Sequence, residues 1–162
     1  MSIRKIFEEE LAALKTELVE MCRLTEQMIE NAGTLLLLED LRDPGNLGTI
    51  VRTAEATGVA GIILSKESVD IYNPKVIRST MGAIYRVPFL YVEDFKGLLV
   101  RLKEQNIRLL AAHLKGTKNF DKADYSGKVG ILIGNEANGL SDEVAKLAEE
   151  KVWIPMAGNV ES

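Results

Sequence analysis

The sequence is poor in the residues that build disulfide and metal sites: among 162 residues it has one cysteine, Cys22, and one histidine, His113. A single cysteine excludes an intrachain disulfide framework and suits a reducing compartment, so we expect a cytoplasmic protein. Without a Cys/His cluster, we expect no zinc or other metal site. No apolar run approaches the roughly 18–20 residues that span a bilayer, and Glu8–Glu10 stand where the apolar part of a secretory signal would begin. We therefore expect no membrane partner.

Several common motifs of α/β proteins are also missing. No G-x-G-x-x-G follows the first expected strand and no G-K-[ST] occurs, which argues against a Rossmann dehydrogenase and a P-loop nucleotidase. No nucleophile elbow is present with a histidine and an acid to serve it. His113 follows an expected strand and could line a pocket, although a role outside catalysis is the favoured interpretation.

The net charge of −4 argues mildly against a nucleic-acid partner. The charge is unevenly distributed, because residues 1–33 hold four basic and seven acidic residues and so account for −3 of it. The remaining chain is close to neutral. A neutral domain can bind RNA when its cations converge on one face, so the global charge excludes neither possibility.

Residues 3–30 have the pattern of one amphipathic helix. Apolar residues recur there at three- and four-residue steps: Phe7, Leu11, Leu14, Leu18, Met21 and Met28. We expect this stripe to pack on the rest of the chain or on a second copy, with a coiled-coil or partner-binding helix as the alternative. Residues 1–32 also resemble the opening helix of PhoU-type phosphate-uptake regulators, which would make the chain a composite with a separate segment over residues 1–33.

From Thr34 onward, short apolar runs alternate with helical stretches. The expected strands are Leu35–Glu39, Gly61–Leu64, Val87–Val92, Arg108–Ala112, Val129–Ile133 and Val152–Ile154. The expected helices are Leu47–Thr57, one capped by Asn73, one with Phe95, Leu98, Leu99 and Leu102 on one face, and one capped by Ser141. This alternation predicts an α/β domain with a parallel sheet flanked by helices and right-handed crossovers.

Three polar, glycine-bearing loops follow expected strands: residues 40–48, 134–140 and 155–162. In open parallel sheets, ligands bind outside the carboxyl ends of the strands, so these loops are the candidate site. Residues 43–54 (DPGNLGTIVRTA), 133–140 (IGNEANGL) and 154–162 (IPMAGNVES) resemble, in order, the three motifs of the SpoU/TrmH methyltransferases. Residues 72–82 (YNPKVIRSTMG) resemble the segment between the first two motifs, and the resemblance as a whole covers residues 35–162.

The resemblance implies a trefoil-knotted domain of the SPOUT type over residues 34–162 that binds S-adenosylmethionine and acts as a homodimer. The methyl acceptor would be a ribose 2′-hydroxyl of tRNA or rRNA. The residues implied to take part in catalysis are Arg52, Asn46, Glu136 and Ser162. Those implied to hold the cofactor are Gly134, Asn135, Ile154 and Met156. The candidates for RNA phosphate contacts are Arg42, Lys75, Arg78 and Arg86, whose alternative is a solvated surface role.

The family's third motif continues beyond the serine into a long C-terminal helix, whereas this sequence stops at Ser162. We therefore expect an incomplete knot and impaired methyl transfer, and the helix expected over residues 3–28 could cover the surface that the tail would occupy. A second hypothesis is a non-catalytic RNA- or protein-binding module that retains the methyltransferase fold. A third is a regulator built around the acidic N-terminal helix.

Overall fold

The computed structural model describes residues 33–156 continuously. Before them it describes only single helical positions or short helical pieces: Lys5, Glu8–Glu10, Ala12, Ala13, Thr16 and Arg23. Most of the helix expected over residues 3–30 therefore lies outside the described residues, as do Ser162 and the rest of the third loop beyond Met156. The prediction of an incomplete knot concerns that same end of the chain and stays a prediction.

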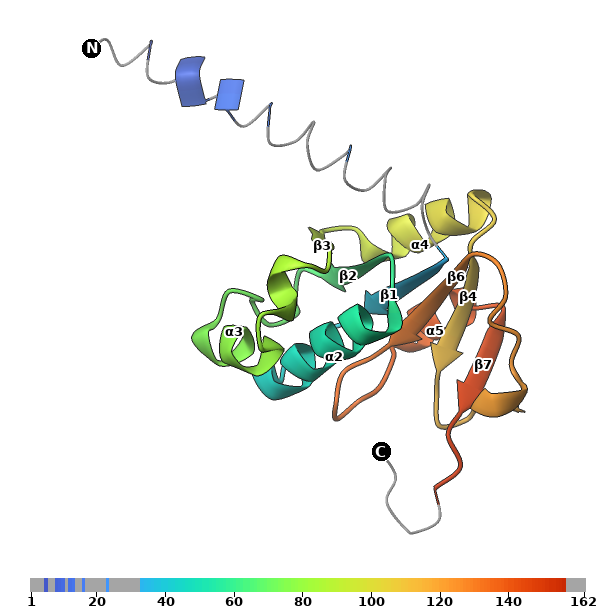
Figure 1. Cartoon of the computed structure of the whole chain (residues 1–162). Helices are drawn as coiled ribbons and strands as arrows, with labels where there is room; N and C mark the ends of the chain where they lie inside the picture. Colours follow the sequence, from blue (N-terminus) through green and yellow to red (C-terminus); the bar gives the residue numbers. More distant parts are fainter. Residues whose placement is uncertain are drawn as a thin grey trace.

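Between residues 33 and 156 the chain forms a sheet of seven strands in the order β3-β2-β1-β6-β4-β7-β5 (Figure 1). All neighbouring strands are parallel. The strands are β1 (Thr34–Leu38), β2 (Gly61–Ser65), β3 (Phe89–Val92), β4 (Arg108–Ala112), β5 (Lys118–Asn119), β6 (Val129–Ile133) and β7 (Glu150–Trp153). The predicted parallel α/β architecture is confirmed.

Helices cover both faces of the sheet (Figure 1). They are α2 (Pro44–Thr57), α3 (Pro74–Thr80), α4 (Phe95–Glu104) and α5 (Asp142–Leu147), with the short 3₁₀ helices η1 (Ala83–Tyr85) and η2 (Phe120–Lys122). Along β1, Leu36 and Leu38 belong to the core under α2, α3 and η1, whereas Leu35 and Leu37 belong to the core under α4 and α5. Burial on both faces explains why the central strands are continuous apolar runs rather than alternating ones.

The expected bounds were wrong at several ends. Helix α2 begins at Pro44 rather than Leu47, because Asp43 caps it by accepting a hydrogen bond of 2.7 Å from the Asn46 backbone N–H. Strand β1 runs one residue earlier than expected, and β3 starts two residues later than expected, at Phe89.

Strands β7 and β5 depart furthest from expectation. β7 begins at the charged Glu150, because β4 and β5 supply backbone partners on both sides of it, and Lys118 and Glu150 form an ion pair of 3.2 Å. The two-residue strand β5 was not predicted. Two residues are too few to show a periodicity, and their pairing is decided by the neighbouring strand.

The connections diverge from the centre of the sheet. Strands β1 and β6 are neighbours, yet α2 leads from β1 to β2 on one side while α5 leads from β6 to β7 beyond β4. Such a switch point leaves room for a ligand between the loops that follow the two strands. The loops after β1 and β6 carry two of the three predicted motifs, and the Glu39 N–H donates to the Ile133 carbonyl across them at 2.9 Å.

Candidate active site

Glu136, in the loop after β6, holds the start of α2. Its Oε1 accepts a hydrogen bond of 2.8 Å from the backbone N–H of Asp43, and its Oε2 accepts one of 3.1 Å from the N–H of Arg42. Asp43 is itself the N-cap of α2. One carboxylate therefore joins the first and second motifs at this edge of the sheet.

This contact also controls the charge of Glu136. Partial burial alone would raise its pKa, but hydrogen bonds from the backbone of Arg42 and Asp43, its own backbone N–H and the side chain of Asn46 outweigh burial and lower the pKa below its ordinary value. Glu136 is therefore held as a carboxylate. Asn46, one of the residues implied to take part in catalysis, contributes to this low pKa from the first turn of α2.

The loop of residues 134–140 is closed by its own backbone. Asn135 and Gly139 exchange two backbone hydrogen bonds of 3.0 and 2.8 Å, and Gly139 has a positive φ of 67°. The Asn135 side chain donates to the Asp40 carbonyl at 2.8 Å and accepts from the N–H groups of Ala137 and Asn138. A Cβ on Gly134 would lie 2.2 Å from the backbone of Gly139 and Leu140, so only glycine allows this closure. Gly134 and Asn135 thus have a structural role that stands beside their predicted cofactor role.

Sequence reasoning missed a second carboxylate contact at the same edge of the sheet. Glu39 accepts hydrogen bonds from the hydroxyl and the backbone N–H of Ser141, at 2.6 and 2.8 Å. The Ser141 hydroxyl in turn caps α5 at Val144. The sequence offers one indication of this contact, because Glu39 is an acidic residue directly after an apolar run. The predicted strand Leu35–Glu39 includes it, whereas β1 ends at Leu38.

Arg52 lies exposed on α2. Within the described part of the chain, its side chain forms neither a hydrogen bond nor an ion pair. Glu136 therefore organises the loops of the first two motifs, and the catalytic role implied for Arg52 stays a prediction. The guanidinium of Arg52, on the helix that follows the first loop, is therefore free to bind a phosphate or another polar oxygen.

Ile154 and Met156 follow β7, with 62% and 50% of their surface exposed. No hydrogen bond joins either residue to the loops after β1 and β6 within residues 33–156. Two exposed apolar side chains at the carboxyl end of a parallel strand suit the flat face of a purine, whose polar edge backbone groups can bind. The residues present therefore fit an adenosine-bearing cofactor.

The four predicted RNA contacts fall into two groups. Arg42 forms an ion pair with Asp40, and Arg86 forms a two-pronged ion pair with Glu55 on α2. Lys75 and Arg78 are exposed on α3, and their side chains have no ion-pair partner among the described residues. The side chains of Lys75 and Arg78 are thus available to bind phosphates, whereas those of Arg42 and Arg86 are already held in ion pairs.

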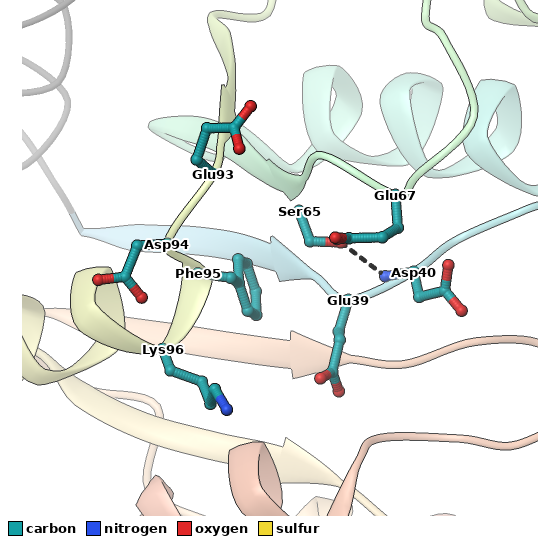
Figure 2. A pocket seen from close by; sticks show the side chains of 8 residues that line it. All are labelled: Glu39, Asp40, Ser65, Glu67, Glu93, Asp94, Phe95 and Lys96. Atoms are coloured by element: carbon teal, nitrogen blue, oxygen red, sulfur yellow. Dashed lines mark hydrogen bonds between the residues drawn. The ribbon is translucent and has the colours of Figure 1, made fainter.

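A cavity of about 340 Å³ opens at the carboxyl ends of β1, β2 and β3 (Figure 2). It is lined by Glu39, Asp40, Ser65, Glu67, Glu93, Asp94, Phe95 and Lys96. Five carboxylates against one lysine repel a phosphate backbone, so this cavity is not a site for RNA. It also shares no residue with the predicted cofactor set.

Two kinds of feature are absent from the described residues. No group of three or more His, Cys, Asp or Glu side chains among them is arranged to hold a metal ion. No helix formed by those residues is long and apolar enough to cross a membrane.

The fold and the joined loops define a parallel α/β domain with a candidate ligand site at the switch point of its sheet. The chain belongs to the SpoU rRNA Methylase family, whose profile matches residues 33–162.

Individual relatives agree with this assignment. An uncharacterized tRNA/rRNA methyltransferase of Synechocystis sp. is 41% identical over 127 residues, which are 78% of this chain and 46% of that protein. The 23S rRNA (guanosine(2553)-2′-O)-methyltransferase of Bacillus subtilis is 25% identical over 90% of this chain and 58% of its own length. The AdoMet-bound crystal structure of an rRNA methyltransferase from Sinorhizobium meliloti superposes with a TM-score of 0.73 at 37% identity, covering 83% of this chain and 53% of that one. The chain spans about half the length of the curated relatives it matches.

Proposed function

We propose that this chain is the methyltransferase domain of an enzyme that transfers a methyl group from S-adenosylmethionine to a ribose 2′-hydroxyl of tRNA or rRNA. The observation that carries the proposal is the contact of Glu136 with the Arg42 and Asp43 N–H groups, which joins two family motifs at the switch point of the sheet. The names of the relatives support RNA as the substrate class, and the Bacillus subtilis relative supports the 2′-oxygen.

In this proposal Gly134, Asn135, Ile154 and Met156 hold the cofactor, largely through backbone groups and apolar cover. When bound, S-adenosylmethionine would supply a methyl group on a sulfonium sulfur, from which a neutral thioether is a good leaving group. The exposed apolar side chains of Ile154 and Met156 support this role, as does the closed loop that begins at Gly134.

Arg52 would orient the ribose hydroxyl and its neighbouring phosphate. A guanidinium is a poor base at its usual pKa, so its proposed contribution is to stabilise negative charge that develops on the 2′-oxygen as the hydroxyl proton passes to solvent water. The absence of an ion-pair partner for Arg52 among the described residues supports this role. Asn46 and Glu136 act by holding the start of α2 in place, and Ser162 is proposed to complete the site.

The test is single-turnover transfer from methyl-labelled S-adenosylmethionine to unmodified tRNA and rRNA transcripts, with the protein in excess so that slow transfer is seen. We expect label in alkali-resistant dinucleotides, because a methylated 2′-oxygen cannot attack the adjacent phosphate. Arg52→Ala should remove most of the signal, and Arg101→Ala on α4 is the matched control. Label confined to bases would refute the ribose assignment, and no cofactor binding by calorimetry would refute the function.

The expectations of a homodimer and of a cytoplasmic location remain proposals. Sedimentation velocity over a range of protein concentrations tests the first, and microscopy of the tagged natural protein tests the second.

A further inference from the structure

Apolar side chains cluster in the open around α3 and η1. Tyr85 is 85% exposed and Met81 75%, with Tyr72 at 65% and Ile77 at 37%. Met81 is the C-cap of α3 and Tyr85 the last residue of η1, and the two are joined by a turn at Gly82, whose φ is 87°. Several large apolar residues exposed together, rather than singly, mark an interaction surface.

Cations share this surface. Lys75 and Arg78 lie on the exposed side of α3, opposite the buried Val76 and Thr80. Residues 44–57 and 74–86 together hold four basic residues and one acid, Glu55, in a chain whose net charge is −4. The surface is therefore a positive region of an acidic protein, which attracts a polyanion.

The same surface adjoins Arg52. Gly48 lies one helical turn before Arg52, and a Cβ there would lie 1.7 Å from the Ser79 hydroxyl of α3. Glu55 lies three residues after Arg52 and binds Arg86 at the end of η1. Arg52 thus stands between the two contacts that join α2 to α3 and to η1, so a ligand on α3 and η1 can reach it.

Charge favours RNA over a second copy of the chain. A twofold interface would bury this patch against the same patch of a second copy, which brings two net-positive surfaces together at a cost in electrostatic repulsion. Exposed aromatic rings interleaved with free cations are instead typical of surfaces on which successive bases stack while cations contact the phosphates.

We infer that the outer face of α3 and η1 binds an unpaired stretch of RNA, with Tyr85 and Met81 against its bases and Lys75 and Arg78 against its phosphates. The RNA must be unpaired there, because bases inside an A-form duplex cannot stack on a side chain. The inference rests on the proposed function. It adds that the RNA substrate is single-stranded next to the ribose that is methylated. Arg86, at the end of η1, is engaged by its ion pair with Glu55 and is therefore not among the cations assigned to the phosphates.

The experiment measures fluorescence anisotropy of a labelled single-stranded RNA of mixed sequence, and of its duplex, with the full 162-residue chain. We expect tighter binding of the single strand. Tyr85→Ala should weaken it by roughly five- to a hundred-fold, whereas Tyr85→Phe should keep most of the affinity. Val100→Ala, another exposed apolar position but on α4, is the matched control. Arg78→Gln and Lys75→Gln should each reduce the slope of log affinity against log salt by roughly 0.7.

Unchanged RNA affinity of Tyr85→Ala, or equal binding of duplex and single strand, would overturn the inference. A change in sedimentation of Tyr85→Ala with RNA affinity intact would also overturn it and identify the patch as a protein interface. Calorimetric titration with S-adenosylmethionine separates the two proposals. If the parent chain binds both cofactor and RNA, and Tyr85→Ala binds RNA equally well, this inference alone is refuted. If the parent chain binds neither cofactor nor RNA, the proposed function is refuted as well.

Discussion

The carboxylate of Glu136 accepts a hydrogen bond of 2.8 Å from the backbone N–H of Asp43, 93 residues away in the sequence. Asp43 caps α2, so the loop after β6 determines where the helix that carries Arg52 begins. The stability of that helix end and the geometry of the proposed site should therefore change together when Glu136 is altered.

Glu136→Gln should lower the free energy of unfolding by about 1–3 kcal/mol, because an amide presents one oxygen where two backbone N–H groups need acceptors. The pKa of Glu136 is lowered, so its contribution is complete above the ordinary value of 4.5 and is lost as the pH falls through the folded value. In urea unfolding, the difference between parent and variant should be constant from neutral pH to about 5 and then shrink. Glu104→Gln on the surface of α4 is the control, and an equal loss there would contradict the prediction.

Gly134→Ala should open the loop after β6, because its Cβ would lie 2.2 Å from the backbone of Gly139 and Leu140. We expect a loss of about 1–3 kcal/mol, typical of overpacking, together with weaker cofactor binding. Thermal unfolding and calorimetry measure the two effects. Gly33→Ala, where an added Cβ meets nothing within 4 Å, should show neither. A Gly134→Ala protein as stable as the parent would refute the steric argument.

Gly48→Ala tests the close approach of α2 and α3. Alanine favours helices by about 1 kcal/mol over glycine, yet its Cβ would lie 1.7 Å from the Ser79 hydroxyl and 2.5 Å from the Ser79 Cβ. We expect net destabilisation, with substantial recovery in the double variant Gly48→Ala/Ser79→Gly, measured as a double-mutant cycle of unfolding free energies. Additive effects in that cycle would mean that the two residues do not meet.

Tyr91 should produce an alkaline loss of stability. Its hydroxyl accepts a hydrogen bond from the Ile71 N–H at 2.9 Å and donates one to the Val69 carbonyl at 2.6 Å, and burial raises its pKa to about 12. The stabilisation is complete below the ordinary pKa of 10 and is lost as the pH rises through about 12. Tyr91→Phe should be less stable than the parent at pH 7, and the gap should narrow above pH 10 in denaturant titrations. A gap that is independent of pH would refute the assignment.

Glu55→Gln should strengthen RNA binding. The substitution removes the acid among the basic residues of α2, α3 and η1 and frees Arg86 from its ion pair. We expect a several-fold gain in affinity at low salt and a steeper salt dependence, with little change in melting temperature, because exposed ion pairs contribute little to stability. Glu104→Gln again serves as the control. A weaker complex would show that the position of Arg86, rather than its free charge, is what RNA binding requires.

Elements with strong local patterns were predicted well. The bounds of β4 and β6 agree with the prediction, because each strand holds a short apolar run that is largely buried. The caps of α3 and α5 were also evident, since Asn73 and Ser141 act on backbone N–H groups two or three residues away. Prediction missed β5 and misplaced the bounds of β7, where the backbone pairs near the edge of the sheet and the side chains carry no pattern.

The sequence by itself determined the apolar runs, the helix caps and the motif residues, because each depends on residues close together in the chain. Only the tertiary structure decided what those residues contact. Glu136 meets the N–H groups of Arg42 and Asp43 because β1 and β6 are neighbours in the sheet. Among the described residues, Arg86 forms an ion pair and Arg78 does not, because the end of η1 lies beside Glu55 of α2. Such pairings depend on strand order and helix packing over tens of residues, and no local pattern encodes them.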